Sequence, residues 1–171
     1  MNLQSDDFAL FGLTPQFAQD SAAIDAQWKH LQAQAHPDKF AAQGAAAQRV
    51  AMQCSVRINE AYRRLKDPLS RAAYLCELHG QPINAHSNTA MPGSFLMQQI
   101  EWREALDEAH TEADLEALLT SVQSSKASLM QECAALIDNQ QDFASAVLPV
   151  RCLMFIDKFV HDLNQRLDAL A

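Results

Sequence analysis

A histidine and an aspartate flank a proline in His36-Pro37-Asp38, the stretch of this chain whose residue types come nearest to a reactive or binding site. An imidazole can serve as a general base, and a neighbouring carboxylate can orient it. Pro37 ends a helix because it lacks an N–H and its ring clashes with the preceding turn. It also pushes His36 out of the helical conformation. The tripeptide therefore predicts an exposed corner that holds both side chains.

The same tripeptide has a plain structural interpretation as a helix stop. A histidine is favoured near a helix C-terminus by the helix dipole, and Pro-Asp is common in turns. No serine or cysteine lies in a nucleophile motif, and no glycine-rich phosphate loop is present. An exposed corner also lacks the enclosed pocket that tunes a catalytic pKa. We therefore expect no enzymatic activity, and the corner is either a helix stop or a recognition site for a partner.

Two amphipathic patterns must position the corner. One runs over residues 20–35, with Asp20 as its N-cap, and the other over residues 45–66, with a loop at 40–44 between them. Helices joined by so short a corner pack as an antiparallel hairpin. Short helices at 6–13 and 69–78 should cover the hairpin. The apolar positions are Ile24, Trp28, Leu31 and Ala35 in the first pattern, Val50, Cys54, Ile58, Ala61 and Leu65 in the second, and Phe8, Phe11, Tyr74 and Leu75 in the short helices.

Residues 81–94 have turn composition without a helical pattern, so we expect a linker there. Three further helical patterns follow, and Thr111 with Asp114 resembles a capping box at the start of the second. Pro149 interrupts the last pattern and predicts a kink or a restart. The predicted fold is all-α: an N-terminal domain at 1–80 and a three-helix bundle at 95–171. The apolar positions of the bundle are Phe95, Trp102, Leu106 and Ala109, then Leu115, Leu118, Val122, Leu129, Cys133 and Leu136, then Leu153, Ile156, Val160, Leu163, Leu167 and Leu170.

Composition and charge exclude several classes of function. The chain has 171 residues and a net charge of −8, and residues 81–171 carry thirteen acidic and five basic residues. Nucleic acid is excluded as the main partner, because phosphate binding needs clustered Lys and Arg. No apolar run is long enough to span a membrane, and the acidic N-terminus is unlike a signal peptide, so we expect a cytoplasmic protein. The four cysteines are too far apart for a Cys-x-x-Cys site and predict reduced, buried thiols, with no metal site and no cofactor.

One face of the predicted helix at 95–109 changes from apolar to acidic. Leu96, Met97 and Ile100 point away from its core side, and the line continues through Glu104 and Glu108, with Glu101 alongside. An apolar patch rimmed by charge often marks a partner site. The last helix carries a similar second stripe. Either the two stripes bind a partner, or they fill a second layer of core; the second stripe consists of Leu148, Cys152, Phe155 and Phe159.

The first half of the chain resembles a J domain. The resemblance rests on Asp7-Phe8, Leu10-Phe11-Gly12-Leu13, His36-Pro37-Asp38-Lys39-Phe40, Ile58-Asn59-Glu60-Ala61-Tyr62, Leu65, Asp67-Pro68 and Arg71-Ala72-Ala73-Tyr74. It covers residues 6–78 with motif, order and spacing in agreement. Ala35 stands where the family usually has an aromatic residue.

The second half is similar to the HscB type of J protein. Phe95-Leu96-Met97, Glu101, Arg103-Glu104 and Leu106-Asp107-Glu108 match its first C-terminal helix, and Phe155-Ile156-Asp157-Lys158 match its last. This resemblance implies a co-chaperone. Its J domain would stimulate ATP hydrolysis by a heat-shock chaperone of the HscA/DnaK class. Its C-terminal bundle would deliver the iron–sulfur scaffold protein IscU.

The resemblance also assigns residues to each partner. For the chaperone they are His36, Pro37, Asp38, Lys39 and Lys29. The alternative is a J protein for a general chaperone, with a C-terminal bundle that is a structural or self-association module; we expect a monomer. The residues expected to bind the scaffold are Leu96, Met97, Ile100, Glu101, Glu104, Glu108 and Phe155.

Overall fold

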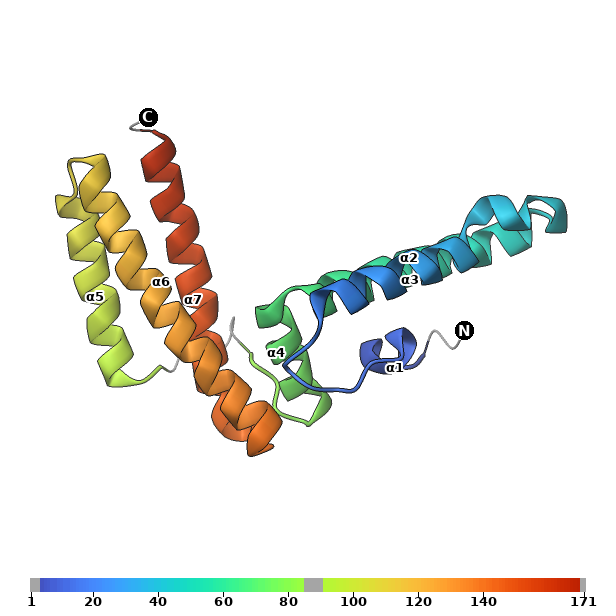
Figure 1. Ribbon diagram of the computed structural model, residues 1–171, viewed down its shortest axis with the longest axis horizontal. Coiled ribbons are helices and arrows are strands. Elements are labelled where there is room, and N and C mark those ends of the chain that lie inside the picture. Colours follow the sequence, from blue (N-terminus) through green and yellow to red (C-terminus); the bar gives the residue numbers. More distant parts are fainter. Residues whose placement is uncertain (1–3, 85–90, 170–171) are drawn as a thin grey trace. The chain divides into compact units, whose positions relative to one another are not determined.

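The computed structural model describes residues 4–84 and 91–169, and over that range every regular element is helical. Contacts divide the chain into two compact units, Met1–Leu75 and Cys76–Ala171. The all-α class is confirmed. In order, the elements are α1 (Asp7–Phe11), α2 (Ser21–Ala35), η1 (Pro37–Gln43), α3 (Ala45–Lys66), α4 (Pro68–Leu78), α5 (Gly93–Glu108), α6 (Glu112–Ala134), η2 (Ala135–Asn139) and α7 (Phe143–Asp168) (Figure 1).

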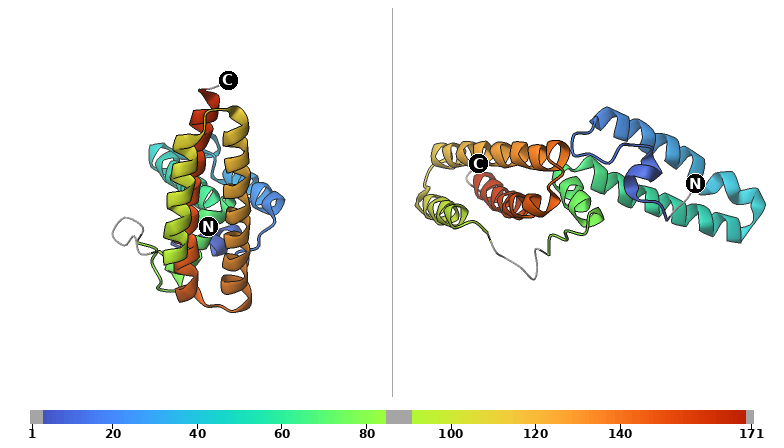
Figure 2. Two further views of the ribbon diagram at one scale, coloured as in Figure 1. Left: turned by 90° about the vertical axis from the view of Figure 1, so that its left-hand side faces the viewer. Right: turned by 90° about the horizontal axis from the view of Figure 1, so that it is seen from below.

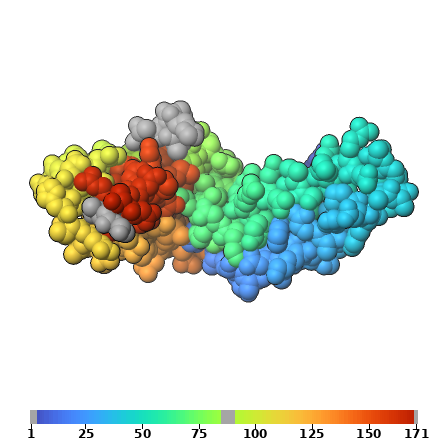
Figure 3. All heavy atoms as spheres, turned by 90° about the horizontal axis from the view of Figure 1, so that it is seen from above, coloured from blue at the N-terminus to red at the C-terminus, as the bar shows by residue number. Residues whose placement is uncertain are grey.

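The first unit is built on a hairpin of α2 and α3, which lie side by side along their lengths (Figures 1 and 3). The side chain of Asp20 accepts a hydrogen bond from the Ala22 N–H and starts α2. Pro37 ends α2 after Ala35, as predicted. The predicted bounds of α3 are confirmed at both ends. The helices at α1 and α4 cover the hairpin, since Phe8, Phe11, Ile24, Ile58, Leu65 and Leu75 are all buried.

The second unit is a bundle in which α5, α6 and α7 run alongside one another (Figure 2). The predicted capping box is present: the Thr111 side chain accepts from the Asp114 N–H, and the Asp114 carboxylate accepts from the Thr111 N–H. Buried residues from all three helices form one core: Phe95, Trp102, Ala109, Leu115, Leu118, Val122, Cys152, Ile156, Phe159 and Leu163.

Two sequence predictions about local structure are wrong, and the structure selects among the alternatives left open at two other places. Residues 40–43 belong to the 3-10 helix η1 rather than a loop, because Pro37 at its start and the Lys39 N–H bonding to the His36 carbonyl favour a tight turn. Val50 is 56% exposed rather than buried; Ala51 takes the core position. Of the kink or restart predicted at Pro149, the restart is absent, because α7 continues through the buried Pro149 and packing offsets one missing hydrogen bond. Cys152 and Phe159 of the second stripe are buried, which agrees with the alternative that these residues fill the core.

The segment after α4 belongs to the second unit. The boundary between the units lies at Leu75/Cys76, whereas the sequence analysis ends the first domain at residue 80. The residue directly after α4 explains the difference, because the His79 ring stacks on Phe143 with centroids 3.6 Å apart. Ile83 is buried, and its carbonyl accepts a hydrogen bond of 2.8 Å from Arg151 Nε. Residues 85–90 of the predicted linker, and Leu170, lie outside the described residues.

Candidate functional site

The corner between α2 and α3 places His36 and Asp38 at the surface, with side chains 57% and 89% exposed. His36 adopts an extended backbone with φ −62° and ψ 125°, as the residue before a proline should. Its Nδ1 accepts a hydrogen bond of 3.3 Å from the Asp38 N–H and lies 3.6 Å from Asp38 Oδ2. Because Nδ1 accepts, the neutral ring carries its proton on Nε2. The corner therefore offers one N–H donor and one carboxylate to the outside at a fixed spacing.

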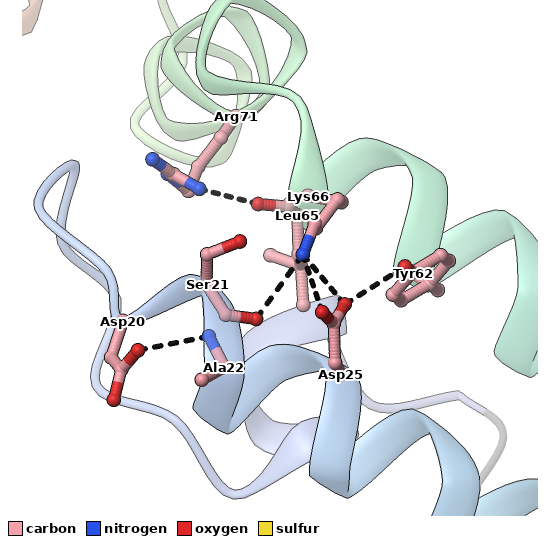
Figure 4. Close-up of polar contacts among 8 residues, drawn as sticks. All are labelled: Asp20, Ser21, Ala22, Asp25, Tyr62, Leu65, Lys66 and Arg71. Carbon is pink, nitrogen blue, oxygen red and sulfur yellow. Dashed lines mark hydrogen bonds and ion pairs between the residues drawn. The ribbon is translucent and has the colours of Figure 1, made fainter.

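Polar contacts fix how α2 and α3 pair, and so where the corner lies. Lys66 Nζ sits 2.6 and 2.7 Å from the two carboxylate oxygens of Asp25, and the Tyr62 hydroxyl donates to Asp25 Oδ1 at 2.9 Å (Figure 4). The hydrogen bond from Lys66, and then that from Tyr62, lowers the pKa of the Asp25 carboxyl below its ordinary value. This cluster joins the start of α2 to the end of α3, at the end of the hairpin away from the corner.

A second set of polar contacts lies closer to the corner. Trp28 Nε1 donates to Asn59 Oδ1 at 2.9 Å, and Gln32 Nε2 donates to the same oxygen at 2.8 Å. The Ser55 hydroxyl donates to Gln32 Oε1 at 2.6 Å. A sliding of α2 along α3 would break all of these contacts together, so they hold the corner in one register.

At the start of α1, the first unit contains a buried carboxylate. Asp7 is fully buried, and its oxygens lie 2.6 Å from Arg57 Nη2 and 3.2 Å from Arg64 Nη1, close enough for ion pairs but without aligned hydrogen bonds. The Asp7 N–H donates to the Tyr74 hydroxyl at 3.0 Å. Arg57 and Arg64 of α3 therefore have a structural role.

Next to the corner, the ends of α2, η1 and α3 enclose a mainly apolar hollow of about 470 Å³. Ala35 and Phe40 line one side, and Val50, Ala51 and Cys54 line the other. The small side chain of Ala35 leaves this space open. Lys29 and Lys39 are exposed on α2 and η1, so a partner at the corner meets positive charge as well.

On α5, the predicted apolar and acidic residues share one solvent-exposed face. Leu96, Met97 and Ile100 are 45%, 60% and 51% exposed. All three predicted glutamates on the helix are exposed too. We call these six residues the client face: Leu96, Met97, Ile100, Glu101, Glu104 and Glu108.

Phe155 reaches the surface beside α5 from α7. It is half-buried, and its ring meets the Phe95 ring edge-on with centroids 5.9 Å apart. The Arg103 guanidinium lies 5.6 Å from the Phe155 ring centroid. A partner that covers Phe155 would therefore also meet Arg103, which the sequence pattern did not single out, because periodicity does not show which ring a side chain will cover.

The cysteines are free thiols. Burial raises the pKa of Cys76 and of Cys152 to about 11, and that of Cys133 to about 12, so these three thiols stay protonated at neutral pH. Within residues 4–84 and 91–169, no three or more His, Cys, Asp or Glu side chains are arranged to hold a metal ion.

Comparisons with known proteins agree with this geometry. A family model described as the HSCB C-terminal oligomerisation domain matches residues 91–164. The co-chaperone protein HscB homolog of Cupriavidus taiwanensis is 48% identical over 171 residues, which cover 98% of this chain and 97% of that protein. That of Bordetella avium is 47% identical over 159 residues, which cover 92% of this chain and 95% of that protein. This chain belongs to the HscB co-chaperone family.

Solved HscB structures have the same architecture. Chaperone HscB from Vibrio cholerae superposes with a TM-score of 0.85 at 33% identity, covering 98% of this chain and 100% of that one. Human co-chaperone protein HscB gives a TM-score of 0.91 at 25% identity, covering 97% of this chain and 84% of that one. The predicted HscB resemblance is confirmed. As an HscB family member, the chain is a co-chaperone that regulates a partner chaperone and is not itself an enzyme.

None of the described helices is both long and apolar enough to cross a bilayer.

Proposed function

We propose that this HscB family member delivers an IscU-type iron–sulfur scaffold protein to an ATPase chaperone of the HscA/DnaK class and stimulates that chaperone's ATP hydrolysis. The observation that carries the proposal is that one chain has both an outward-facing His36/Asp38 corner and an exposed client face. Each feature lies on a rigid helical frame, so each can serve as a docking surface.

The corner is suited to act on another protein rather than on a small substrate. Asp38 is almost fully exposed, so no enclosed pocket surrounds the imidazole and the carboxylate. Such groups act by making charge-assisted hydrogen bonds with a partner surface. Lys29 and Lys39 add positive charge that favours an acidic surface on the chaperone.

The client face is suited to a partner with an apolar patch. Three exposed apolar side chains on one helix face are costly unless a partner covers them. Methionine adapts its shape to the surface it meets. The glutamates alongside would select a scaffold surface that carries basic residues.

The first test measures ATP turnover by the purified chaperone with and without this protein. Replacing Asp38 with Ala or Asn should abolish most of the stimulation, since the partner loses its carboxylate contact while the helices remain intact. Glu60→Gln is the matched control, because Glu60 is an exposed carboxylate on α3 away from the corner. Stimulation by the Asp38 variants equal to that of the unmodified protein would refute the chaperone half of the proposal.

The second test measures binding of the scaffold protein by titration calorimetry. Changing Leu96, Met97 and Phe155 together to alanine should weaken binding about tenfold or more, because the buried apolar area is lost. A control protein with the same number of exposed apolar side chains removed from α3 should bind normally; it changes Val50, Met52 and Val56 to alanine. Equal affinities for both variants would argue against the client face.

A second candidate function is self-association through the C-terminal bundle. The matching family model is described as an oligomerisation domain, which favours it. The client face would then bind another copy of this chain instead of a scaffold protein. The state of the protein in solution separates the two candidates.

A further inference from the structure

A groove of about 650 Å³ runs between α5 and α6, beside the client face. Met97 and Glu101 form its α5 side, and Ser128 and Glu132 form its α6 side. Leu129 and the buried Cys152 lie at its apolar floor. The two helices lie side by side in Figure 2, and the Ser125 hydroxyl donates to Gln98 Oε1 at 3.2 Å between them. The groove is therefore part of the fixed frame of the bundle.

The charged side chains that line the groove are all negative. Two carboxylates, Glu101 and Glu132, line it, and no lysine or arginine does. Among the residues described, neither carboxylate takes part in an ion pair or a side-chain hydrogen bond. The nearest lysine on α6, Lys126, is already paired with Asp157. The groove thus has a negative charge that this chain does not neutralise.

The negative charge of Glu132 acts on the Cys152 thiol inside the groove. Burial first, and then this carboxylate, raises the pKa of the Cys152 thiol to about 11. A cation placed between Glu101 and Glu132 would lie over an apolar floor, where water screens an ion pair less than it does on an open surface. The described chain has no cluster of potential ligands arranged for a metal ion, so a basic side chain is the fitting cation.

The groove is continuous with the client face, because Met97 and Glu101 belong to both. A partner that covers Leu96 and Ile100 on α5 therefore reaches the groove without crossing bare surface. Lysine and arginine combine an apolar stem with a charged head, which matches an apolar floor between two carboxylates. The size of the groove is sufficient for a short segment with such a side chain.

We propose that the groove between α5 and α6 receives a lysine- or arginine-bearing segment of the same scaffold protein that covers the client face. The inference rests on the proposed function and extends it. It adds Ser128 and Glu132 of α6 to the binding surface.

The test titrates the full-length protein with the purified IscU-type scaffold protein at low and at physiological salt. Glu132→Lys should weaken binding roughly fivefold or more at low salt, and the difference should shrink as salt screens the charge. Ser128→Trp, which fills the groove without changing charge, should weaken binding at both salt concentrations. Glu116→Lys is the matched control, since it makes the same charge change at an exposed position of α6 outside the groove.

The outcomes separate this inference from the proposed function. If Leu96→Ala weakens binding while Glu132→Lys and Ser128→Trp do not, the groove proposal is overturned and the client face stands. Equal losses for Glu132→Lys and Glu116→Lys would indicate a general effect of charge and would also overturn it. If the unmodified protein does not bind the scaffold, both proposals fail. Circular dichroism checks the fold of each variant, and Glu132→Gln, which preserves the shape of the side chain, should give a smaller loss than Glu132→Lys.

Discussion

Single side chains decide what the corner can offer. His36 Nδ1 accepts from the Asp38 N–H, so the histidine faces the outside through Nε2–H, while the carboxylate of Asp38 is 89% exposed. Their roles depend on the backbone that Pro37 imposes. A substitution of Pro37 would therefore act by changing the positions of both groups at once.

The carboxylate of Asp25 should make the stability of the first unit depend on pH. Lys66 and then Tyr62 lower its pKa below the ordinary value of 3.8, so its stabilising effect is present above that value and is lost as the pH falls through its lower value in the folded protein. Asp25→Asn should therefore destabilise α2 and α3 at neutral pH. The difference from the unmodified protein should shrink once the pH falls below the lowered pKa of Asp25 in the folded protein.

Amide hydrogen exchange in α2 and α3 measures this effect for the first unit separately. Glu60→Gln serves as control, because Glu60 is exposed on α3 and makes no ion pair within the described part of the chain. It should change exchange at neither pH. A loss for Asp25→Asn of equal size at neutral and acid pH would show that packing, and not the ion pair with Lys66, is responsible.

At the scale of elements, the sequence predicted where helices begin and end better than which side chains they bury. The bounds of α3 follow from Gly44 before it and from Asp67-Pro68 after it, which are local signals. Helical periodicity gives the spacing of a buried stripe but not its exact orientation. The pattern therefore predicts that Val50 is buried, whereas its side chain is exposed. The core of α3 instead uses Ala51, whose small side chain allows the close approach of its neighbours.

The candidate site was predicted only in part for the same reason. The exposed positions of α5 follow from one helix alone, since Trp102 and Phe95 define its buried side. The second stripe of α7 divides instead, with Cys152 and Phe159 in the core and Phe155 at the edge. The groove needs α5 and α6 together, and no local pattern shows that Ser128 and Glu132 lie across from Met97 and Glu101. Contacts between distant segments are fixed by packing, which the sequence pattern does not show.

The polar contacts of the hairpin likewise join elements that are far apart in the chain. Asn59 accepts from both Trp28 and Gln32, which lie 31 and 27 residues away. These contacts explain why a corner of so few residues can keep a defined position. The position of the corner is therefore set by the hydrogen bonds between α2 and α3 in addition to the backbone of the corner.

For the molecule as a whole, the distribution of charge predicts the oligomeric state in solution. If two copies paired through their client faces around a two-fold axis, both copies of Glu101, Glu104 and Glu108 would enter the same interface. Such pairing places like charges together in a surface that must lose water, which costs free energy. A scaffold protein with basic residues avoids this cost.

We therefore predict that the protein is a monomer over the micromolar range, in agreement with delivery of a scaffold and not with self-association. Sedimentation at several concentrations and at low and high salt measures this. The variant Glu104→Gln with Glu108→Gln removes most of the repulsion while it leaves Leu96, Met97 and Ile100 in place, so it should associate more readily than the unmodified protein. A stable dimer of the unmodified protein at low salt, disrupted by Leu96→Ala, would instead assign the client face to a second copy of this chain. High salt should strengthen any residual pairing of the unmodified protein, because screening weakens the repulsion between glutamates more than the apolar contact.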